Sequence, residues 1–178
     1  MGFIKRVFLC GCIVGGALPL FAQAENVAYG DIVFRAGDES IQHWLLPARP
    51  PYPSDNKPTK ERVALGKQLF FDPRLSGDSN MSCATCHNPS LGWGDALATS
   101  RGAKSEMLAR ATPTIFNTGY NSIQMWDGRK KTLEDQALGP ITSEQEMNMD
   151  ITKLMDFLVG NHGYKVAFAE AFPGESIT

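Results

Sequence analysis

The chain has 178 residues, with 17 lysines and arginines against 19 aspartates and glutamates, and a formal net charge of −2 at pH 7. Removal of the N-terminal leader described next would take two basic residues with it and leave a charge of −2 − 2 = −4. A mildly acidic chain argues against nucleic acid as a partner, because binding to phosphates requires an excess of positive charge.

Residues 1–24 predict a signal peptide for export. Lys5 and Arg6 precede the apolar run VFLCGCIVGGALPLFA, and Ala22-Gln23-Ala24 forms a small-x-small cleavage site. The run is interrupted by glycines and a proline, and a transmembrane helix needs roughly 20 apolar residues. We therefore expect cleavage, no membrane anchor afterwards and a periplasmic location. A retained anchor, or a lipoprotein with the lipid on Cys12, is a weaker alternative.

The mature chain of 178 − 24 = 154 residues is about the size of one domain. Residues 25–58 contain many prolines and predict an extended lead-in, because proline removes a backbone donor and restricts its neighbour. The segment TKERVALGKQLFFD that follows predicts a helix with Thr59 as N-cap and Asp72-Pro73 as its stop.

Three further helices are predicted towards the C-terminus. One is TLEDQALG, capped by Thr132 and ended by Gly139, and the second is DITKLMDFLVGN, capped by Asp150. The third is YKVAFAEAF, which begins at Tyr164. Residues 76–101 and 112–120 predict loops, with one helical turn at 83–87. The fold class is therefore mostly α with long loops, and long ordered loops in a small domain indicate a large buried cofactor.

The number of cysteines limits the possible roles of those in the mature chain. Cys10 and Cys12 leave with the signal peptide, and only Cys83 and Cys86 remain. An exported protein lives where thiols oxidise, so these two must form a disulfide, hold a metal or be chemically occupied. A zinc site would need four ligands and no second cysteine pair exists to supply them. A thioredoxin-like site would need a strand before the motif, and none is readable.

The segment CATCH, residues 83–87, fits a third chemistry, the C-x-x-C-H motif of covalently attached haem. Two thiols on one helical turn can each add to a vinyl group of the haem edge, and the next residue presents an imidazole to the iron. The sequence therefore predicts one haem c on Cys83 and Cys86, with His87 as proximal iron ligand.

The ligand opposite His87 separates two function classes, since a strong sixth ligand makes an electron carrier and an open position makes a catalyst. Small cytochromes c commonly use a methionine there. Met155 lies on an apolar helix face and is expected in the core, whereas Met147 and Met149 lie in a polar loop and stay candidates.

Three blocks of sequence point to a known family. They are LGKQLFFDPRLSGDSNMSCATCHNPSLGW, ARATPTIFNTGYNSIQMWDGR and TLEDQALGPITSEQEMNM, within residues 65–172. In this order they resemble the N-terminal haem domain of the bacterial di-haem cytochrome c peroxidases, a family that includes the methylamine-utilisation protein MauG. The resemblance implies a cytochrome c-like haem domain over residues 59–178 and a second haem in a C-terminal domain. That domain is missing from this chain, so we expect a fragment, and a true mono-haem protein is the alternative.

The resemblance also implies roles for four residues on the far side of the haem. Trp126 matches the tryptophan between the two haems, and Gln136, Pro140 and Glu146 match residues of the distal pocket. Glu146 is the candidate acid and base for cleavage of the O–O bond of hydrogen peroxide. Purely structural roles compete with these: Glu146 could complete a capping box with Ser143, Gln136 could be a solvated helix residue, and Trp126 could be ordinary core.

Two departures from the family pattern affect the expected site. The peroxidases usually carry a histidine near the position of Ala103 that can bind the iron at rest, and its absence implies an open or water-bound iron. They also carry an asparagine bound to calcium at the position of Ala111, so calcium is in doubt here. Asp127 and Arg129 are expected to form a local ion pair that closes a turn.

Three functions are consistent with these residues. The first is a periplasmic c-type haem oxidoreductase of the MauG type, which uses hydrogen peroxide to build tryptophan tryptophylquinone in a methylamine dehydrogenase precursor. The second is a cytochrome c peroxidase that takes electrons from a small cytochrome or cupredoxin. The third, from a different class, is a non-catalytic electron-transfer cytochrome with methionine ligation.

Overall fold

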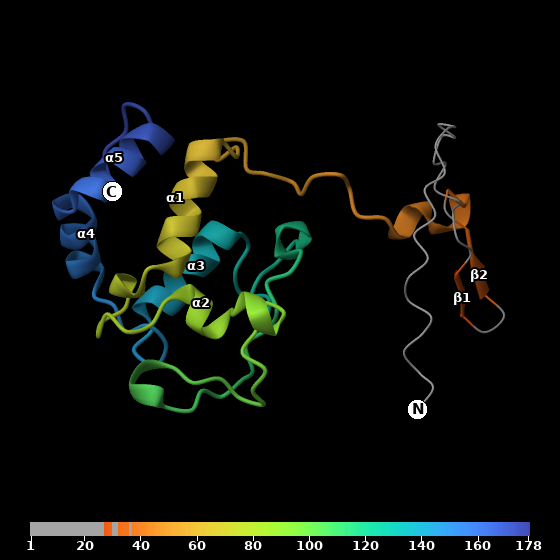
Figure 1. The fold of residues 1–178 in the computed structure, drawn as a ribbon, viewed down its shortest axis with the longest axis horizontal. Coiled ribbons are helices and arrows are strands. Elements are labelled where there is room, and N and C mark those ends of the chain that lie inside the picture. The colour runs from red at the N-terminus through yellow and green to blue at the C-terminus, as the bar shows by residue number, and fades with distance from the viewer. Residues whose placement is uncertain (1–26, 30–31, 36) are drawn as a thin grey trace, which may run out of the picture. The chain divides into compact units, whose positions relative to one another are not determined.

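The computed structural model describes residues 27–29, 32–35 and 37–178. The chain divides into two units, and the boundary along the sequence lies between Leu46 and Pro47. The predicted signal peptide lies outside the described residues. In the first unit, strands β1 (Val27–Tyr29) and β2 (Ile32–Phe34) pair antiparallel, and the 3-10 helix η1 (Glu39–Trp44) follows (Figure 1). A short hairpin therefore occupies part of the segment that was expected to be extended.

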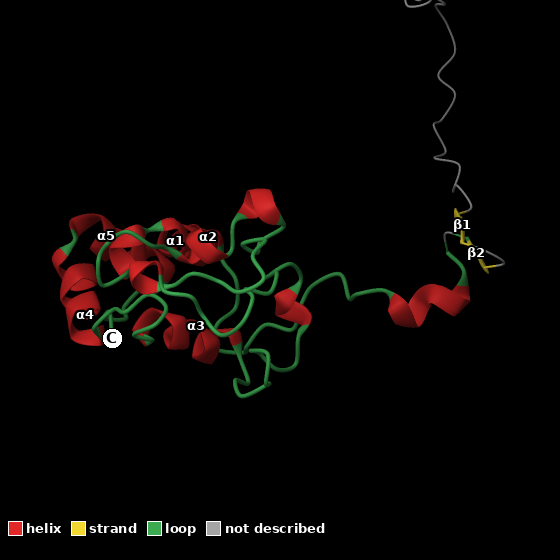
Figure 2. Ribbon diagram, turned by 90° about the horizontal axis from the view of Figure 1, so that it is seen from below, coloured by secondary structure: helices red, strands yellow, loops and turns green. Residues whose placement is uncertain are grey.

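The second unit is built from helices joined by long loops (Figure 2). Helix α1 packs on α5, α5 packs on α4, and the short α2 contacts α1. The mostly α fold with long loops is thus confirmed. Its elements are α1 (Lys60–Phe71), η2 (Pro73–Leu75), α2 (Cys83–Cys86), η3 (Pro89–Leu91), η4 (Ala103–Ser105), η5 (Thr118–Tyr120), α3 (Leu133–Thr142), α4 (Ile151–Gly160) and α5 (His162–Ala171).

The helices begin where polar caps precede them. The side chains of Thr59, Thr132 and Asp150 accept hydrogen bonds from backbone N–H groups in the first turns of α1, α3 and α4. Asn161 caps α5 in the same way, through a bond of 3.1 Å from the N–H of Tyr164. Helix α5 therefore starts two residues before the predicted start at Tyr164, because the cap and not the aromatic stripe sets the boundary.

Helix α3 continues past the predicted stop at Gly139 and contains Pro140 in its last turn. The returning loop satisfies the exposed carbonyls of that turn. The N–H of Met147 donates to the carbonyl of Pro140 at 3.1 Å, and the N–H of Met149 donates to Ile141 at 2.9 Å. Backbone carbonyls that would otherwise lack partners are thus paired by tertiary contacts, which the local sequence does not reveal.

The core lies where α1, α4 and α5 meet, and Tyr164 is its fully buried centre. The Tyr164 hydroxyl donates to the Asp72 carboxylate at 2.6 Å, and Arg74 forms an ion pair with the same carboxylate at 2.6 Å. This group fastens the end of α1 to α5 and so positions the chain that leads into α2.

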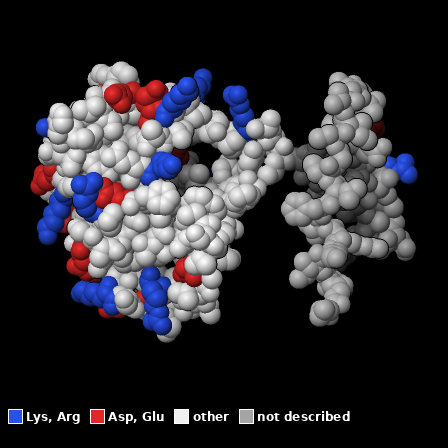
Figure 3. Space-filling model, in the orientation of Figure 1, with Lys and Arg blue, Asp and Glu red and all other residues white. Residues whose placement is uncertain are grey.

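Acidic and basic side chains are interspersed over the second unit on the face seen in Figure 3. Within the part of the chain that the structure describes, no helix combines the length and the apolar character needed to cross a membrane.

Candidate functional site

The predicted attachment motif lies on α2, one turn of helix with His87 at its C-terminal end. The N–H of Ser82 donates to Thr85 Oγ1 at 3.0 Å, and the N–H of His87 donates to the carbonyl of Cys83 at 2.9 Å. The turn therefore presents Cys83, Cys86 and His87 together. Both cysteines are free thiols and half-buried.

The imidazole of His87 has one nitrogen fixed by the backbone. His87 Nδ1 lies 3.2 Å from the carbonyl oxygen of Trp93. A carbonyl only accepts, so in the neutral imidazole this bond places the ring proton on Nδ1 and leaves the lone pair on Nε2. An imidazole held in this tautomer is suited to bind iron through Nε2.

The two thiols lie in surroundings that keep them protonated. Burial raises the pKa of Cys83, and burial together with the negative charges of Asp95 and Glu146 raises the pKa of Cys86. Addition to a vinyl group transfers both the sulfur and its hydrogen, so a neutral thiol is the form that the covalent attachment consumes. The donor set and its local geometry fit a haem c.

The rival interpretations of the cysteines find less support. The described residues hold no cluster of three or more His, Cys, Asp or Glu side chains that could bind a metal ion, as a structural zinc site would require. A loop, residues 76–82, precedes α2, whereas a thioredoxin-like motif follows a strand.

The four residues expected on the distal side come from α3, from the loop after it and from the turn before it. Gln136 and Pro140 are four residues apart on α3 and share a helix face. The loop then folds back on the end of α3 through the bond between Met147 N–H and the Pro140 carbonyl. This return places Glu146 beside Pro140.

The carboxyl of Glu146 is half-buried, and its surroundings favour a proton. Burial raises its pKa, while the positive charge of Arg129, a hydrogen bond from Ser143 and the charge of His87 act in the opposite direction. Glu146 thus lies within electrostatic reach of His87, although the two residues are 59 positions apart in the sequence. The alternative role in a capping box is not supported, because Ser143 ends α3 and no helix begins there.

Trp126 lies in the turn that precedes α3. Its side chain is exposed, with a relative accessible surface of 63%, so it is not ordinary core. The indole N–H donates to the carbonyl of Ala111 at 3.0 Å. The expected ion pair between Asp127 and Arg129 closes the same turn, with Arg129 Nη1 at 2.8 Å from both carboxylate oxygens.

Gln136 is half-buried and therefore is not a freely solvated side chain. Its amide Nε2 lies 3.6 Å from the sulfur of Met125, the residue before Trp126. The structure thus joins Gln136 to the tryptophan turn, whereas Glu146 and the helix α2 influence each other only through their charges. No hydrogen bond among the described residues links Gln136 directly to Glu146.

Ala103, where the peroxidases usually carry a histidine, is buried and lies next to the Glu146 segment. Its N–H donates to the carbonyl of Gln145 at 3.1 Å. A Cβ atom at the preceding residue, Gly102, would lie 1.8 Å from that carbonyl oxygen. Only glycine at position 102 permits this close approach, which brings the loop of Ala103 against the distal segment.

The methionines proposed as alternative iron ligands lie in the hydrophobic core. Met147 and Met149 are buried, with relative accessible surfaces of 6% and 9%, among residues of α1, α4 and α5. Met107 is largely exposed. The two loop methionines therefore serve to pack the hydrophobic core.

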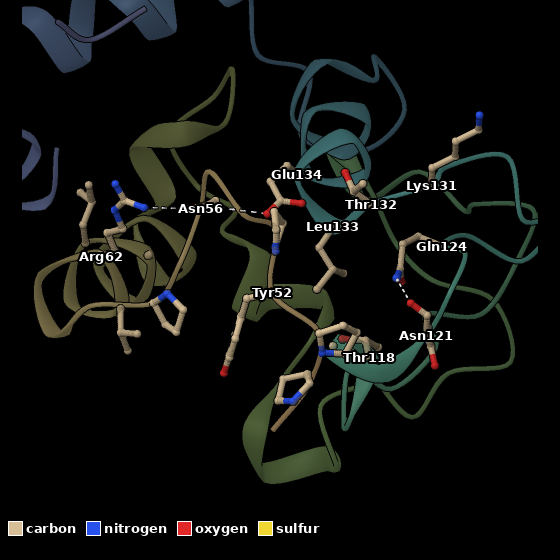
Figure 4. A pocket seen from close by; sticks show the side chains of 18 of the residues that line it. Tyr52, Asn56, Arg62, Thr118, Asn121, Gln124, Lys131, Thr132, Leu133 and Glu134 are labelled. Carbon is tan, nitrogen blue, oxygen red and sulfur yellow. Dashed lines mark hydrogen bonds between the residues drawn. The ribbon is translucent and has the colours of Figure 1, made fainter. Parts of the chain in front are cut away.

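One cavity of the second unit has a volume of about 770 Å³ (Figure 4). Its walls come from the proline-rich segment, α1, the loop around η5 and the start of α3, where Asn56 bridges Arg62 and Glu134 by hydrogen bonds. Its lining does not include Cys83, Cys86 or His87. The haem is not expected in this cavity, because thioether bonds to Cys83 and Cys86 would fix the haem edge at the two sulfurs.

Sequence reasoning missed several residues that shape the site. Trp93 acts through a backbone carbonyl, which leaves no signature in the side-chain pattern. Met125 and Arg129 approach the distal residues only after folding. Ser100 is buried and pairs with Thr112 through their hydroxyls, and Asp95 Oδ2 is buried without a hydrogen-bond partner among the described residues.

Comparison with known proteins identifies a single family. Residues 60–178 match the family model described as di-haem cytochrome c peroxidase. The chain is 47% identical over 129 residues to the methylamine utilization protein MauG of Methylorubrum extorquens, covering 72% of this chain and 36% of that protein. It is 49% identical over 138 residues to the cytochrome-c peroxidase IdrP1 of Denitromonas iodatirespirans, covering 77% and 33%.

Solved structures give the same result. A MauG-like protein associated with microbial copper homeostasis has a TM-score of 0.68 at 31% identity, covering 75% of this chain and 41% of that chain. The diheme peroxidase BthA from Burkholderia thailandensis has a TM-score of 0.58 at 29% identity, covering 66% and 33%. The chain thus spans about a third of the length of the two relatives compared by sequence.

Proposed function

The chain belongs to the di-haem cytochrome c peroxidase family, and we propose that residues 59–178 form a c-type haem domain at which hydrogen peroxide reacts. One observation carries this proposal. The half-buried carboxyl of Glu146, with its raised pKa, lies within electrostatic reach of His87 and of the thiol of Cys86. An ionisable group whose pKa is perturbed by burial and by nearby charged groups is a candidate for a catalytic site.

The residues that would hold the haem are those of α2. Cys83 and Cys86 would tether it through thioether bonds, and His87 would bind its iron through Nε2. When bound, the haem supplies the redox chemistry with peroxide, and the protein supplies orientation and proton transfer.

Glu146 is the residue placed to move the proton. Because burial raises its pKa, the carboxyl keeps its proton to a higher pH than an exposed glutamate and can donate it to a leaving oxygen. The guanidinium of Arg129 favours the ionised form, which is the form that accepts a proton. These opposed influences suit a group that alternates between acid and base.

The positions of the methionines favour a catalyst over an electron carrier. Met147 and Met149 are packed in the core, and removing either to ligate iron would open a cavity there. A methionine-ligated electron carrier, the proposal from the other class, therefore has less support.

Within the family we favour a MauG-type role. The proposed reaction is the oxidation of tryptophans in a methylamine dehydrogenase precursor to form tryptophan tryptophylquinone. One feature supports it: by the resemblance, Ala103 stands near the position where the peroxidases usually carry a histidine. Trp126, which the resemblance places between the two haems, is suited to carry electrons between this domain and the second haem.

A cytochrome c peroxidase is the second candidate, because the identity to IdrP1 of Denitromonas iodatirespirans is 49%. In that role the partner would be a small cytochrome or cupredoxin. Both candidates require export to the periplasm through the predicted signal peptide, and both place a second haem in a C-terminal domain.

The experiment that tests the proposal uses the protein matured in a host that attaches haem c. Addition of peroxide to the ferric protein should change its absorption and EPR spectra. A purely low-spin, methionine-ligated spectrum that peroxide leaves unchanged would contradict the proposal. Full-length protein is then given peroxide with either a reduced small cytochrome or the methylamine dehydrogenase precursor. Rapid turnover with the cytochrome alone would remove the MauG-type role.

A further inference from the structure

The turn formed by Gly92 and Trp93 has an unusual backbone. Both residues adopt left-handed conformations, with φ of 69° and 62°. This region suits glycine and disfavours a bulky side chain such as that of tryptophan, so surrounding contacts must hold Trp93 there. The carbonyl oxygen of Trp93 accepts a hydrogen bond from the Nδ1–H of His87 at 3.2 Å.

A neighbouring loop is fastened to this turn by two hydrogen bonds. The hydroxyl of Thr114 donates to the carbonyl of Gly92 at 2.6 Å, and the N–H of Ile115 donates to the carbonyl of Trp93 at 3.3 Å. Thr114 Oγ1 also accepts from the N–H of Phe116 at 3.1 Å, which fixes the direction of its hydroxyl proton. The loop therefore reaches the peptide group that aims the Trp93 carbonyl at His87.

We propose that Thr114 is a positioning residue for the proximal histidine: its hydroxyl holds the Gly92–Trp93 turn so that the Trp93 carbonyl binds His87 Nδ1–H. Loss of the hydroxyl would let the strained turn relax and lengthen that bond. A weaker bond at Nδ1 makes the imidazole a poorer donor to iron, which destabilises the ferric state and raises the reduction potential. This inference rests on the proposed haem ligation by His87.

The test compares three variants of the full, haem-loaded chain. Thr114→Val removes the hydroxyl while keeping the shape, and Thr114→Ser keeps the hydroxyl. Thr118→Val is the matched control, because Thr118 Oγ1 donates to a carbonyl of the same loop, that of Ile115 at 3.0 Å, without touching the turn. The readouts are the midpoint potential of the haem on Cys83 and Cys86 and the iron–histidine stretching band of the ferrous protein.

We expect Thr114→Val to raise the midpoint potential and to shift the stretching band to lower frequency, with Thr114→Ser and Thr118→Val close to the parent. If Thr114→Val does not fold, Thr114→Ala is measured against the same two controls. Equal potentials in all folded variants, or an equal shift in Thr118→Val or Thr114→Ser, would overturn the proposal.

The outcome is separable from that of the proposed function. If the chain carries haem but its spectra do not change with peroxide, the proposed function is refuted, while the comparison of the Thr114 variants can still be made. A chain that acquires no covalent haem would refute both.

Discussion

Replacing Asp72 by Asn should destabilise the protein, because it removes a buried negative charge that accepts hydrogen bonds from Arg74 and Tyr164. The Asp72 side chain is 6% exposed and accepts hydrogen bonds from both Arg74 and the Tyr164 hydroxyl. The hydrogen bond from Arg74 is the largest influence on the carboxyl, and with that from Tyr164 it lowers the pKa from 3.8 to about 2, although burial acts in the opposite direction. Asparagine keeps the shape and loses the negative charge.

The magnitude follows from the pKa. A lowering from 3.8 to about 2 corresponds to ~2 kcal/mol of stability at neutral pH, at about 1.4 kcal/mol per pKa unit. Because the folded-state pKa is depressed, this stability is present above the unfolded pKa near 3.8 and is lost as the pH falls through about 2. The difference between parent and variant should therefore fall by about half near pH ~3.

The assay is denaturant unfolding followed by circular dichroism at neutral and acidic pH, on the haem-loaded chain. Asp127→Asn is a matched control, because Asp127 pairs with an arginine two residues later, as Asp72 does, but at the surface with 45% exposure. It should change stability much less, since solvent screens exposed ion pairs. A loss in Asp72→Asn that stays constant down to pH ~2 would refute the reasoning and point to geometry instead of charge.

The remaining predictions concern the site. Glu146→Gln should slow the reaction with peroxide by about 10²- to 10⁴-fold in stopped-flow absorption without loss of haem, and unchanged kinetics would return the residue to a structural role. Cys83→Ala should leave at most one thioether bond, seen as a shifted pyridine haemochrome band. Gly102→Ala should lower the melting temperature, because its Cβ would lie 1.8 Å from the Gln145 carbonyl oxygen. The matched control is Gly66→Ala in α1, whose Cβ would meet no atom within 4 Å and which should stabilise the helix by ~0.5–1 kcal/mol. A similar drop in melting temperature in both variants would contradict the predicted clash at Gly102.

The helix starts were the most predictable part of the fold. Thr59, Thr132 and Asp150 each cap the helix that the sequence assigns to them, because a cap bonds only to the next two or three residues. The end of α3 was mispredicted at Gly139 because the carbonyls of its last turn are paired by the N–H groups of Met147 and Met149. Those partners arrive from a loop whose path depends on core packing.

The candidate site divides in the same way. The C-x-x-C-H motif could be predicted from the sequence alone, since Cys83, Cys86 and His87 lie on one turn and their mutual placement needs no tertiary contact. The electrostatic influence of His87 on Glu146 and the bond from His87 Nδ1 to the Trp93 carbonyl could not be predicted, because both depend on packing. Helix turns and caps depend on neighbours only a few residues away in the sequence. The pKa values and the histidine tautomer depend instead on groups that packing brings together from distant segments.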